Sequence, residues 1–333
     1  MKISRTTVVA SAATLALLAI LAASPRLLGG HVGSALAALG GAERRWLVLG
    51  AVGFVAAFGA TVASWRAALA ASGGHICPKQ AGARLGIGSM VNSFAPAKLG
   101  DAVKIALCAK AIDAPGRIWT AGGVYAALAG ARSLALAAVI VAASATGAMP
   151  LWPVFAVCGV VGVLATASSL SGRLRRHPRI KQVLEGIAAL ERSPRALVKV
   201  LGWTAAMQLA RLGGTMAVAA SLGIPHPVLA ALIILPALDL ASAFPITPGS
   251  IGIGSGAVAV ALATRGIGMT HALSVGFAIQ GLETLVSVTA GSAGLLYLAP
   301  RGAAVRRWTV RIATLGASAG IAAGLGLLLV DAF

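Results

Sequence analysis

Long apolar runs alternate with short gaps rich in polar residues, glycine or proline along the whole chain. A helix that crosses the hydrocarbon core of a bilayer needs about 20 predominantly apolar residues. Runs of this kind predict seven spanning helices, at about 7–23, 46–70, 118–145, 151–170, 197–221, 269–297 and 312–330. The pattern therefore predicts an all-α polytopic membrane protein in which residues 1–333 form a single integral membrane domain.

Two further apolar stretches, at about 85–109 and 228–264, are interrupted at their centres by glycine, proline and polar residues. Proline lacks the backbone N–H that a helix interior needs. Non-helical backbone at membrane depth is tolerated only where protein or a water-filled cavity satisfies its polar groups. We therefore expect both stretches to be broken, re-entrant hairpins.

The composition supports this interpretation. Hydrophobic residues make up 58% of the chain and charged residues 11%, against about 25% charged residues in soluble domains, which excludes a soluble enzyme. A net charge of +19 would suggest nucleic-acid binding in a soluble protein. Here the basic residues fall mostly in short gaps between apolar runs, where they set orientation and attract anionic lipids, so no nucleic-acid partner is expected.

The linker 171–199 is the most basic segment of the chain. Loops rich in Lys and Arg lie on the cytoplasmic side of a membrane, so we expect this linker to be cytoplasmic. With seven crossings, the N-terminus is then cytoplasmic and the C-terminus outside, in the plasma membrane. The first loop does not fit this orientation, because it places Arg26, Arg44 and Arg45 on the outer face. The first helix also has the three-part look of a secretory signal; an uncleaved helix is favoured, and cleavage stays open.

The order span, broken hairpin, span occurs at 46–145 and again at 197–297, offset by about 151 residues. With their flanking spans, the two repeats cover about 46–170 and 197–330. In the predicted orientation the two copies are inverted relative to each other. Inverted repeats with discontinuous helices at matching positions indicate an alternating-access transporter whose site lies at the repeat interface.

In the first interruption, we predict that a helix starts near Asp101, and Lys98 and Lys104 lie on either side of this point in the sequence. A helix that begins there points its free amides and positive dipole end into the membrane. Charged side chains at this depth are costly unless they pair or line a wet cavity, which favours a functional site. The alternative is a cytoplasmic loop with solvated charges.

The second interruption contains Pro248, Gly249 and Gly252. Its glycines resemble a phosphate-binding loop, but the strand and the Lys-Ser/Thr pair of a nucleotide site are absent. Small residues here favour close packing of the two hairpin arms and exposed amides that could hold an anionic headgroup.

Further charges lie within the predicted spans. Arg132 and Arg211 could each grip a phosphate in a bidentate manner, or form ion pairs with Asp239 or Glu283 that lock helices together. Asp101, Asp239 and Glu283 are candidates for carrying a coupling proton. The three cysteines and five histidines lack metal-ligand spacing, so no metal or cofactor is expected. No hydrolase constellation is present, so we expect no enzyme activity.

The two interruptions together resemble the flippase-like transmembrane domain family, the membrane region found in lysylphosphatidylglycerol synthases and as stand-alone proteins. The resemblance covers about 46–297 and rests on Asn92, Pro96, Gly100, Asp101 and Lys104, followed by Pro248, Gly249 and Gly252. This sequence departs from the family pattern in having Lys104, Ser255 and Gln280 where an arginine, an acidic residue and an arginine are more usual.

The resemblance implies transbilayer movement of a lipid. It does not imply aminoacylation, which the synthases carry in a separate soluble domain that this chain is expected to lack. The leading hypothesis is thus a translocase for an anionic phospholipid or a polyprenyl-phosphate-linked headgroup, with membrane lipids as its partners and the residues of both motifs, Arg132 and Arg211 as its site. Two alternatives are an ion-coupled transporter of a small hydrophilic anion and a non-transporting scaffold for cell-envelope biosynthesis enzymes. A lipid-modifying enzyme is disfavoured, because the eight acidic residues are scattered singly.

Overall fold

The computed structural model describes residues 39–95, 99–113, 116–149, 178–243 and 251–299, and within these ranges the chain is helical and contains no strand. The elements are the short 3-10 helix η2 (Leu39–Gly41) and the α-helices α3 (Arg44–Ala71), α4 (Pro78–Phe94), α5 (Leu99–Ala109), α6 (Arg117–Ala145), α8 (Pro178–Glu191), α9 (Pro194–Ser221), α10 (Pro227–Ala243), α11 (Ile251–Ala263) and α12 (Met269–Leu298). The expected all-α membrane fold is confirmed.

Four predicted spans correspond to the long helices α3, α6, α9 and α12. Of the described helices, α3, α6 and α12 are long and apolar enough to cross a membrane. α9 is 28 residues long but carries Arg195, Lys199 and Arg211. The predicted spans at 7–23, 151–170 and 312–330 lie outside the described residues.

Both predicted hairpins are broken helices. α4 and α5 have 17 and 11 residues, and α10 and α11 have 17 and 13, so each helix is shorter than the roughly 20 residues needed to cross. The two helices of each hairpin contact each other. As expected, α5 begins beside Asp101, which lies in its first turn. Of the motif residues, Pro96, Lys98, Pro248 and Gly249 lie outside the described residues.

The predicted linker 171–199 is partly helical. Its central part forms α8, which packs against α6. The contact is close, because a Cβ on Gly186 would lie 3.0 Å from the Cα of Gly123. α9 begins at Pro194, three residues before the predicted span, because proline with its fixed φ and missing N–H suits the first turn of a helix.

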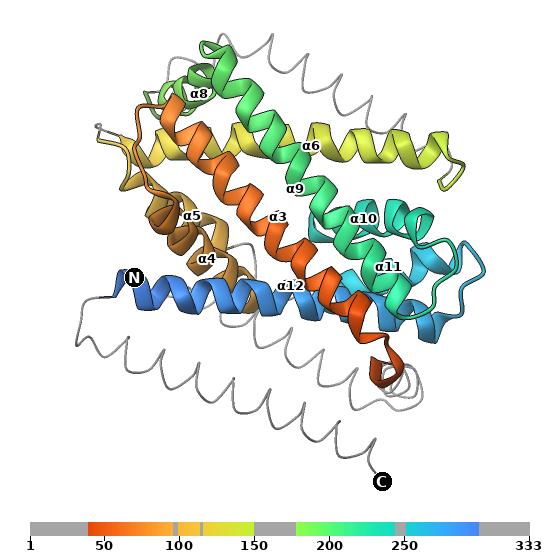
Figure 1. The fold of residues 1–333 in the computed structure, drawn as a ribbon. Helices are drawn as coiled ribbons and strands as arrows, with labels where there is room; N and C mark the ends of the chain where they lie inside the picture. The colour runs from red at the N-terminus through yellow and green to blue at the C-terminus, as the bar shows by residue number, and fades with distance from the viewer. Residues whose placement is uncertain (1–38, 96–98, 114–115, 150–177, 244–250, 300–333) are drawn as a thin grey trace, which may run out of the picture.

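α3 and α9 run side by side through the middle of the molecule, with α6 and α12 on either side (Figure 1). Glycines bring the central pair together, since a Cβ on Gly53 would lie 2.8 Å from the Cα of Gly214. Small residues allow this close approach between membrane helices. A hydrogen bond of 3.2 Å between the hydroxyls of Ser64 and Thr204 also joins the pair.

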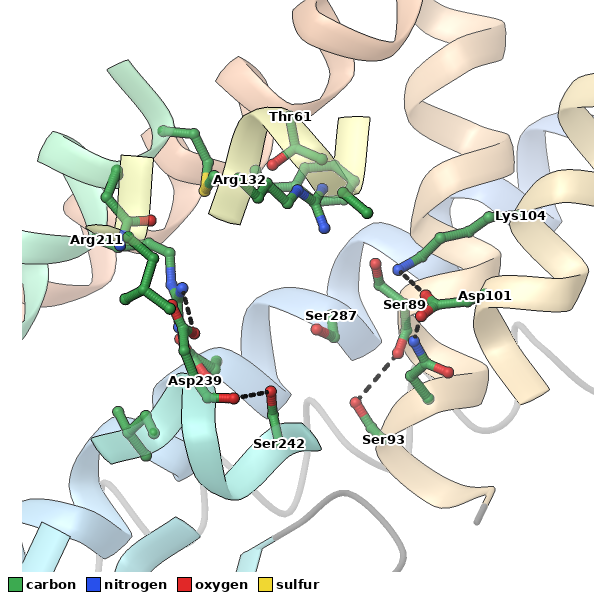
Figure 2. A pocket seen from close by; sticks show the side chains of 18 of the residues that line it. Thr61, Ser89, Ser93, Asp101, Lys104, Arg132, Arg211, Asp239, Ser242 and Ser287 are labelled. Atoms are coloured by element: carbon green, nitrogen blue, oxygen red, sulfur yellow. Dashed lines mark hydrogen bonds and ion pairs between the residues drawn. The ribbon is translucent and has the colours of Figure 1, made fainter. Parts of the chain in front are cut away.

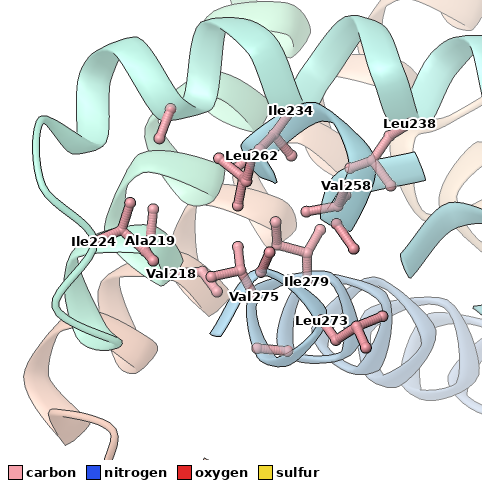
Figure 3. Packing of buried hydrophobic residues seen from close by; sticks show 14 of the residues in the cluster. Val218, Ala219, Ile224, Ile234, Leu238, Val258, Leu262, Leu273, Val275 and Ile279 are labelled. Carbon is pink, nitrogen blue, oxygen red and sulfur yellow. The ribbon is translucent and has the colours of Figure 1, made fainter. Parts of the chain in front are cut away.

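The hairpins lie at opposite ends of the flanking helices. The first packs against α12 through α4 and against α6 through α5, and the second packs against α6 through α10 and against α12 through α11. Two large buried apolar clusters stabilise the described helices, and each takes most of its residues from one half of the chain. In the second half, Val218, Ile234, Leu262 and Ile279 meet between α9, α10, α11 and α12 (Figure 3), and Trp65, Leu69 and Leu85 belong to the corresponding cluster of the first half.

The long helices expose many large apolar side chains on their outer faces. Val52 of α3, Leu134 of α6 and Leu209 of α9 are each more than half exposed. A row of exposed aliphatic side chains suits contact with lipid tails rather than with water. These apolar faces would contact lipid, whereas the charged side chains near the middle of the helices line an internal cavity.

Candidate functional site

A cavity of about 560 Å³ lies where α3, α4, α5, α6, α9, α10 and α12 converge (Figure 2). Its lining includes nearly all the intramembrane charges that the sequence singled out. The lining residues are Phe58, Thr61, Ser89, Asn92, Ser93, Ala95, Asp101, Lys104, Tyr125, Ala129, Arg132, Ser133, Leu136, Met207, Gln208, Arg211, Leu238, Asp239, Ser242, Gln280, Glu283, Thr284 and Ser287.

The first hairpin contributes a cluster centred on Asp101. Its Oδ1 accepts a 2.8 Å hydrogen bond from Nδ2 of Asn92 and forms a 3.0 Å ion pair with Nζ of Lys104. Its Oδ2 accepts a 2.8 Å hydrogen bond from the hydroxyl of Tyr125 on α6. The Asp101 and Lys104 side chains are 18% and 14% exposed, so this charge pair lies at the cavity wall. The carboxylate thus joins α4, α5 and α6.

The second half contributes a cluster centred on Arg211. Its Nη1 lies 2.8 Å from Oδ1 of Asp239 on α10, and its Nη2 lies 3.4 Å from Oε1 of Glu283 on α12. One guanidinium therefore ties α9 to the second hairpin and to a flanking helix. Of the two alternatives for Arg211, the structure shows the interhelical ion pair.

Arg132 lies between the two clusters. In Figure 2 its guanidinium points into the space that separates the Asp101 cluster from the Arg211 cluster. It forms no ion pair or hydrogen bond with any residue that the structure describes. An arginine presents five N–H donors in a planar fork, so Arg132 is the cation of this lining best placed to bind an added anion.

Two predicted site residues play a different part. Gly100 and Gly252 do not line the cavity. Gly100 is buried where α5 meets α4, and a Cβ there would overlap the carbonyl oxygen of Gly88 and the side chain of Asn92. Its role is close packing of the hairpin rather than an amide contact in the cavity. Gly252 is exposed on α11.

The sequence did not single out Tyr125, Gln208 or the hydroxyl side chains of the lining. A tyrosine in a spanning helix has no motif of its own, and serine and threonine are common in membrane helices. Their significance depends on which helix faces converge, and this is visible only in the fold. Gln280, which departs from the family pattern, also has a structural role. Its Nε2 packs against Gly254, and a Cβ on Gly254 would overlap that atom. Within the described residues, no group of three or more His, Cys, Asp or Glu side chains could hold a metal ion.

These features define a polytopic α-helical membrane protein with two broken hairpins around a charged internal cavity. The sequence model of the lysylphosphatidylglycerol synthase transmembrane region matches residues 7–291. The chain therefore belongs to that family, and the resemblance drawn from its two motifs is confirmed. No curated protein and no solved structure matches the chain.

Proposed function

We propose that this protein is a lipid translocase of the plasma membrane that moves an anionic phospholipid or a polyprenyl-phosphate-linked headgroup between leaflets. The observation that carries the proposal is the cavity itself, in which Arg132 has no ion-pair partner among the described residues. A headgroup cannot cross hydrocarbon without losing its hydration at great cost. A polar cavity inside apolar-surfaced helices would supply the missing contacts while the lipid tails stay in the bilayer.

In this proposal the three cations have different roles. Arg132 would bind the headgroup phosphate directly through two parallel N–H donors. Lys104 and Arg211 are already paired with Asp101 and with Asp239 and Glu283. They would set the shape and potential of the cavity, and would contact phosphate only by giving up a carboxylate.

An inverted repeat would provide the change of access. The helix lengths run 28, 17, 11 and 29 residues in α3 to α6, and 28, 17, 13 and 30 in α9 to α12. Each contact among these eight helices also has a counterpart, as with α4 on α12 and α10 on α6. These regularities support two copies of one unit, with the cavity at their interface, rocking about α3 and α9. The proposed orientation keeps the N-terminus cytoplasmic and the C-terminus outside.

A second candidate is an ion-coupled transporter of a small hydrophilic anion. The observation that favours it is the presence of three carboxylates in the lining, on Asp101, Asp239 and Glu283. Any of them could carry a coupling proton in either candidate. Both candidates assign no covalent chemistry to the chain. The scaffold hypothesis differs in that it predicts no transport by the purified protein.

Reconstitution in liposomes separates these candidates. Purified protein would be inserted into vesicles containing tail-labelled phosphatidylglycerol, and the label in the outer leaflet would be extracted with albumin over time. Parallel vesicles would be tested for uptake of radiolabelled glycerol 3-phosphate. The translocase proposal predicts lipid movement faster than in protein-free vesicles and no uptake of the soluble anion. Uptake without lipid movement would favour the anion transporter, and neither activity in folded protein would favour the scaffold.

A further inference from the structure

We infer that the cavity selects a headgroup made of one phosphate and a neutral polyol or sugar, over amino and multiply charged headgroups. The inference deepens the proposed function and rests on it for the lipid. Three features of the lining support this selectivity: its charge balance, the direction of its hydroxyl groups and one buried amide.

Among the described residues of the lining, the formal charges cancel. Lys104, Arg132 and Arg211 face three carboxylates, on Asp101, Asp239 and Glu283. Two of the cations are held in ion pairs, which leaves Arg132 as the cation without a pair in the described lining. A single guanidinium suits a single phosphate. A second phosphate would find no second unpaired cation among the described residues of the lining.

Four hydroxyl side chains of the lining already use their protons in hydrogen bonds to their own helices. Thr61, Ser93 and Ser133 each donate a hydrogen bond to the carbonyl four residues earlier in the same helix, and Ser242 donates to the carbonyl of Asp239. A hydroxyl has one donor and two acceptor lone pairs. These side chains therefore present acceptors to the cavity, from α3, α4, α6 and α10.

Gln208 offers the cavity a hydrogen-bond donor rather than an acceptor. Its side chain lines the cavity and is 5% exposed, and its Nε2 has no hydrogen-bond partner among the described residues. A buried amide donor without a partner destabilises the empty site, so an incoming acceptor would be stabilised there. The cavity thus offers acceptors on several helices and a waiting donor on α9.

A polyol matches both requirements, because each of its hydroxyl groups donates and accepts. The phosphodiester of a lipid headgroup only accepts hydrogen bonds, an ammonium group only donates them, and a quaternary ammonium does neither. A site built for hydrogen-bonding hydroxyl groups discriminates strongly against analogues that lack them. The chemistry of the lining therefore points to a sugar phosphate or an inositol phosphate.

Binding to the purified protein in detergent tests the inference without requiring transport. The probes are glucose 1-phosphate, inorganic phosphate and O-phosphoethanolamine, measured by calorimetry. We expect glucose 1-phosphate to bind at least about tenfold more tightly than the other two. Equal binding of all three, tighter binding of O-phosphoethanolamine, or no binding of glucose 1-phosphate would overturn the inference.

Two variants with a similar local structure provide the control. Ser133 and Thr289 are both exposed hydroxyl residues that donate to a carbonyl four residues earlier in their helices, but Ser133 lines the cavity and Thr289 does not. Ser133→Ala and Gln208→Leu should each weaken binding of glucose 1-phosphate more than binding of inorganic phosphate. Thr289→Ala should leave both unchanged. An equal effect of Ser133→Ala and Thr289→Ala on binding would contradict the assignment of the hydroxyl groups.

A lipid panel then separates this inference from the proposed function. In reconstituted vesicles, tail-labelled phosphatidylinositol should move faster than phosphatidylethanolamine and phosphatidylserine. If all lipids move at one rate, the translocase stands and the headgroup inference fails. If glucose 1-phosphate binds selectively but no lipid moves, the cavity assignment stands and the translocase fails.

Discussion

The hydroxyl of Tyr125 donates a 2.8 Å hydrogen bond to Oδ2 of Asp101, and this bond joins the spanning helix α6 to the first turn of α5. The other carboxylate oxygen receives Asn92 and Lys104. Asp101 thus joins the two helices of the first hairpin and attaches the hairpin to α6. The same contacts place the helix start of α5 at the cavity wall.

Asp101→Asn should destabilise the protein more than Tyr125→Phe. The asparagine leaves Lys104 without its counter-ion, and removing one partner of a buried ion pair costs about 3–5 kcal/mol; the partial exposure of this pair places the cost at the low end or below it. Tyr125→Phe removes one hydrogen bond, which in membrane proteins contributes about 0.6–1.7 kcal/mol. Unfolding in increasing denaturing detergent measures both. Equal losses would show that Lys104 does not depend on the carboxylate.

Gly100→Ala should prevent the first hairpin from closing. The added methyl group would overlap the Gly88 carbonyl oxygen and the Asn92 side chain, and a backbone atom cannot move aside as a flexible side chain can. The expected result is loss of monodisperse protein in gel filtration. Gly82→Ala on α4 is the matched control, since nothing lies within 4 Å of a Cβ there. Normal folding of Gly100→Ala would mean that α4 and α5 are not packed this closely.

Arg211→Ala should be rescued in part by neutralising its partners. The single variant leaves the carboxylates of Asp239 and Glu283 facing each other without the cation that joins them. The triple variant Arg211→Ala, Asp239→Asn, Glu283→Gln removes that repulsion, so it should be more stable than Arg211→Ala alone. Thermal unfolding followed by gel filtration gives the comparison. A triple variant less stable than the single one would argue against the ion-pair network.

Cysteine labelling tests the inverted repeat and its orientation. Cys77 and His226 immediately precede α4 and α10, and both are exposed. In a background with Cys108 and Cys158 replaced, an impermeant maleimide added to intact cells should label His226→Cys in a Cys77→Ala chain and should not label native Cys77. Labelling of both positions from the same side would place the two hairpin entrances on one face and exclude inversion.

Much of the fold could be predicted because breakers and apolar runs act locally. α4 ends at Phe94 and α5 begins at Leu99, on either side of the predicted break, and α3, α6, α9 and α12 lie within a few residues of the predicted spans. The secondary structure of the linker 171–199 could not be predicted in the same way. Its basic composition indicates which side of the membrane it lies on, but not that it contains the helix α8. A hydropathy pattern shows how many residues are apolar and not which face of a helix meets another.

The site could be predicted as a set of charges, but the sequence could not decide between their alternative pairings. For Arg211 it left open a phosphate ligand and an ion pair with Asp239 or Glu283, and the structure shows the ion pair. Lys104, a predicted phosphate ligand, is paired with Asp101. Pairing depends on which helix faces converge. Gly100 shows the same limit, because a glycine at a helix start is compatible both with an anion contact and with close packing, and its neighbours decide between them.

Arg132 provides the most direct test of the account, because it is the cation of the described lining that is left to bind a phosphate. Arg132→Gln and Arg265→Gln would be reconstituted in the same vesicles and assayed for movement of tail-labelled phosphatidylglycerol. Arg265 is exposed away from the cavity, where it contacts the carbonyl of Gly147, so its variant controls for the loss of one positive charge. The account predicts at least a tenfold slower lipid movement with Arg132→Gln, about 1.4 kcal/mol in the barrier, and wild-type movement with Arg265→Gln. Wild-type movement with Arg132→Gln would contradict it.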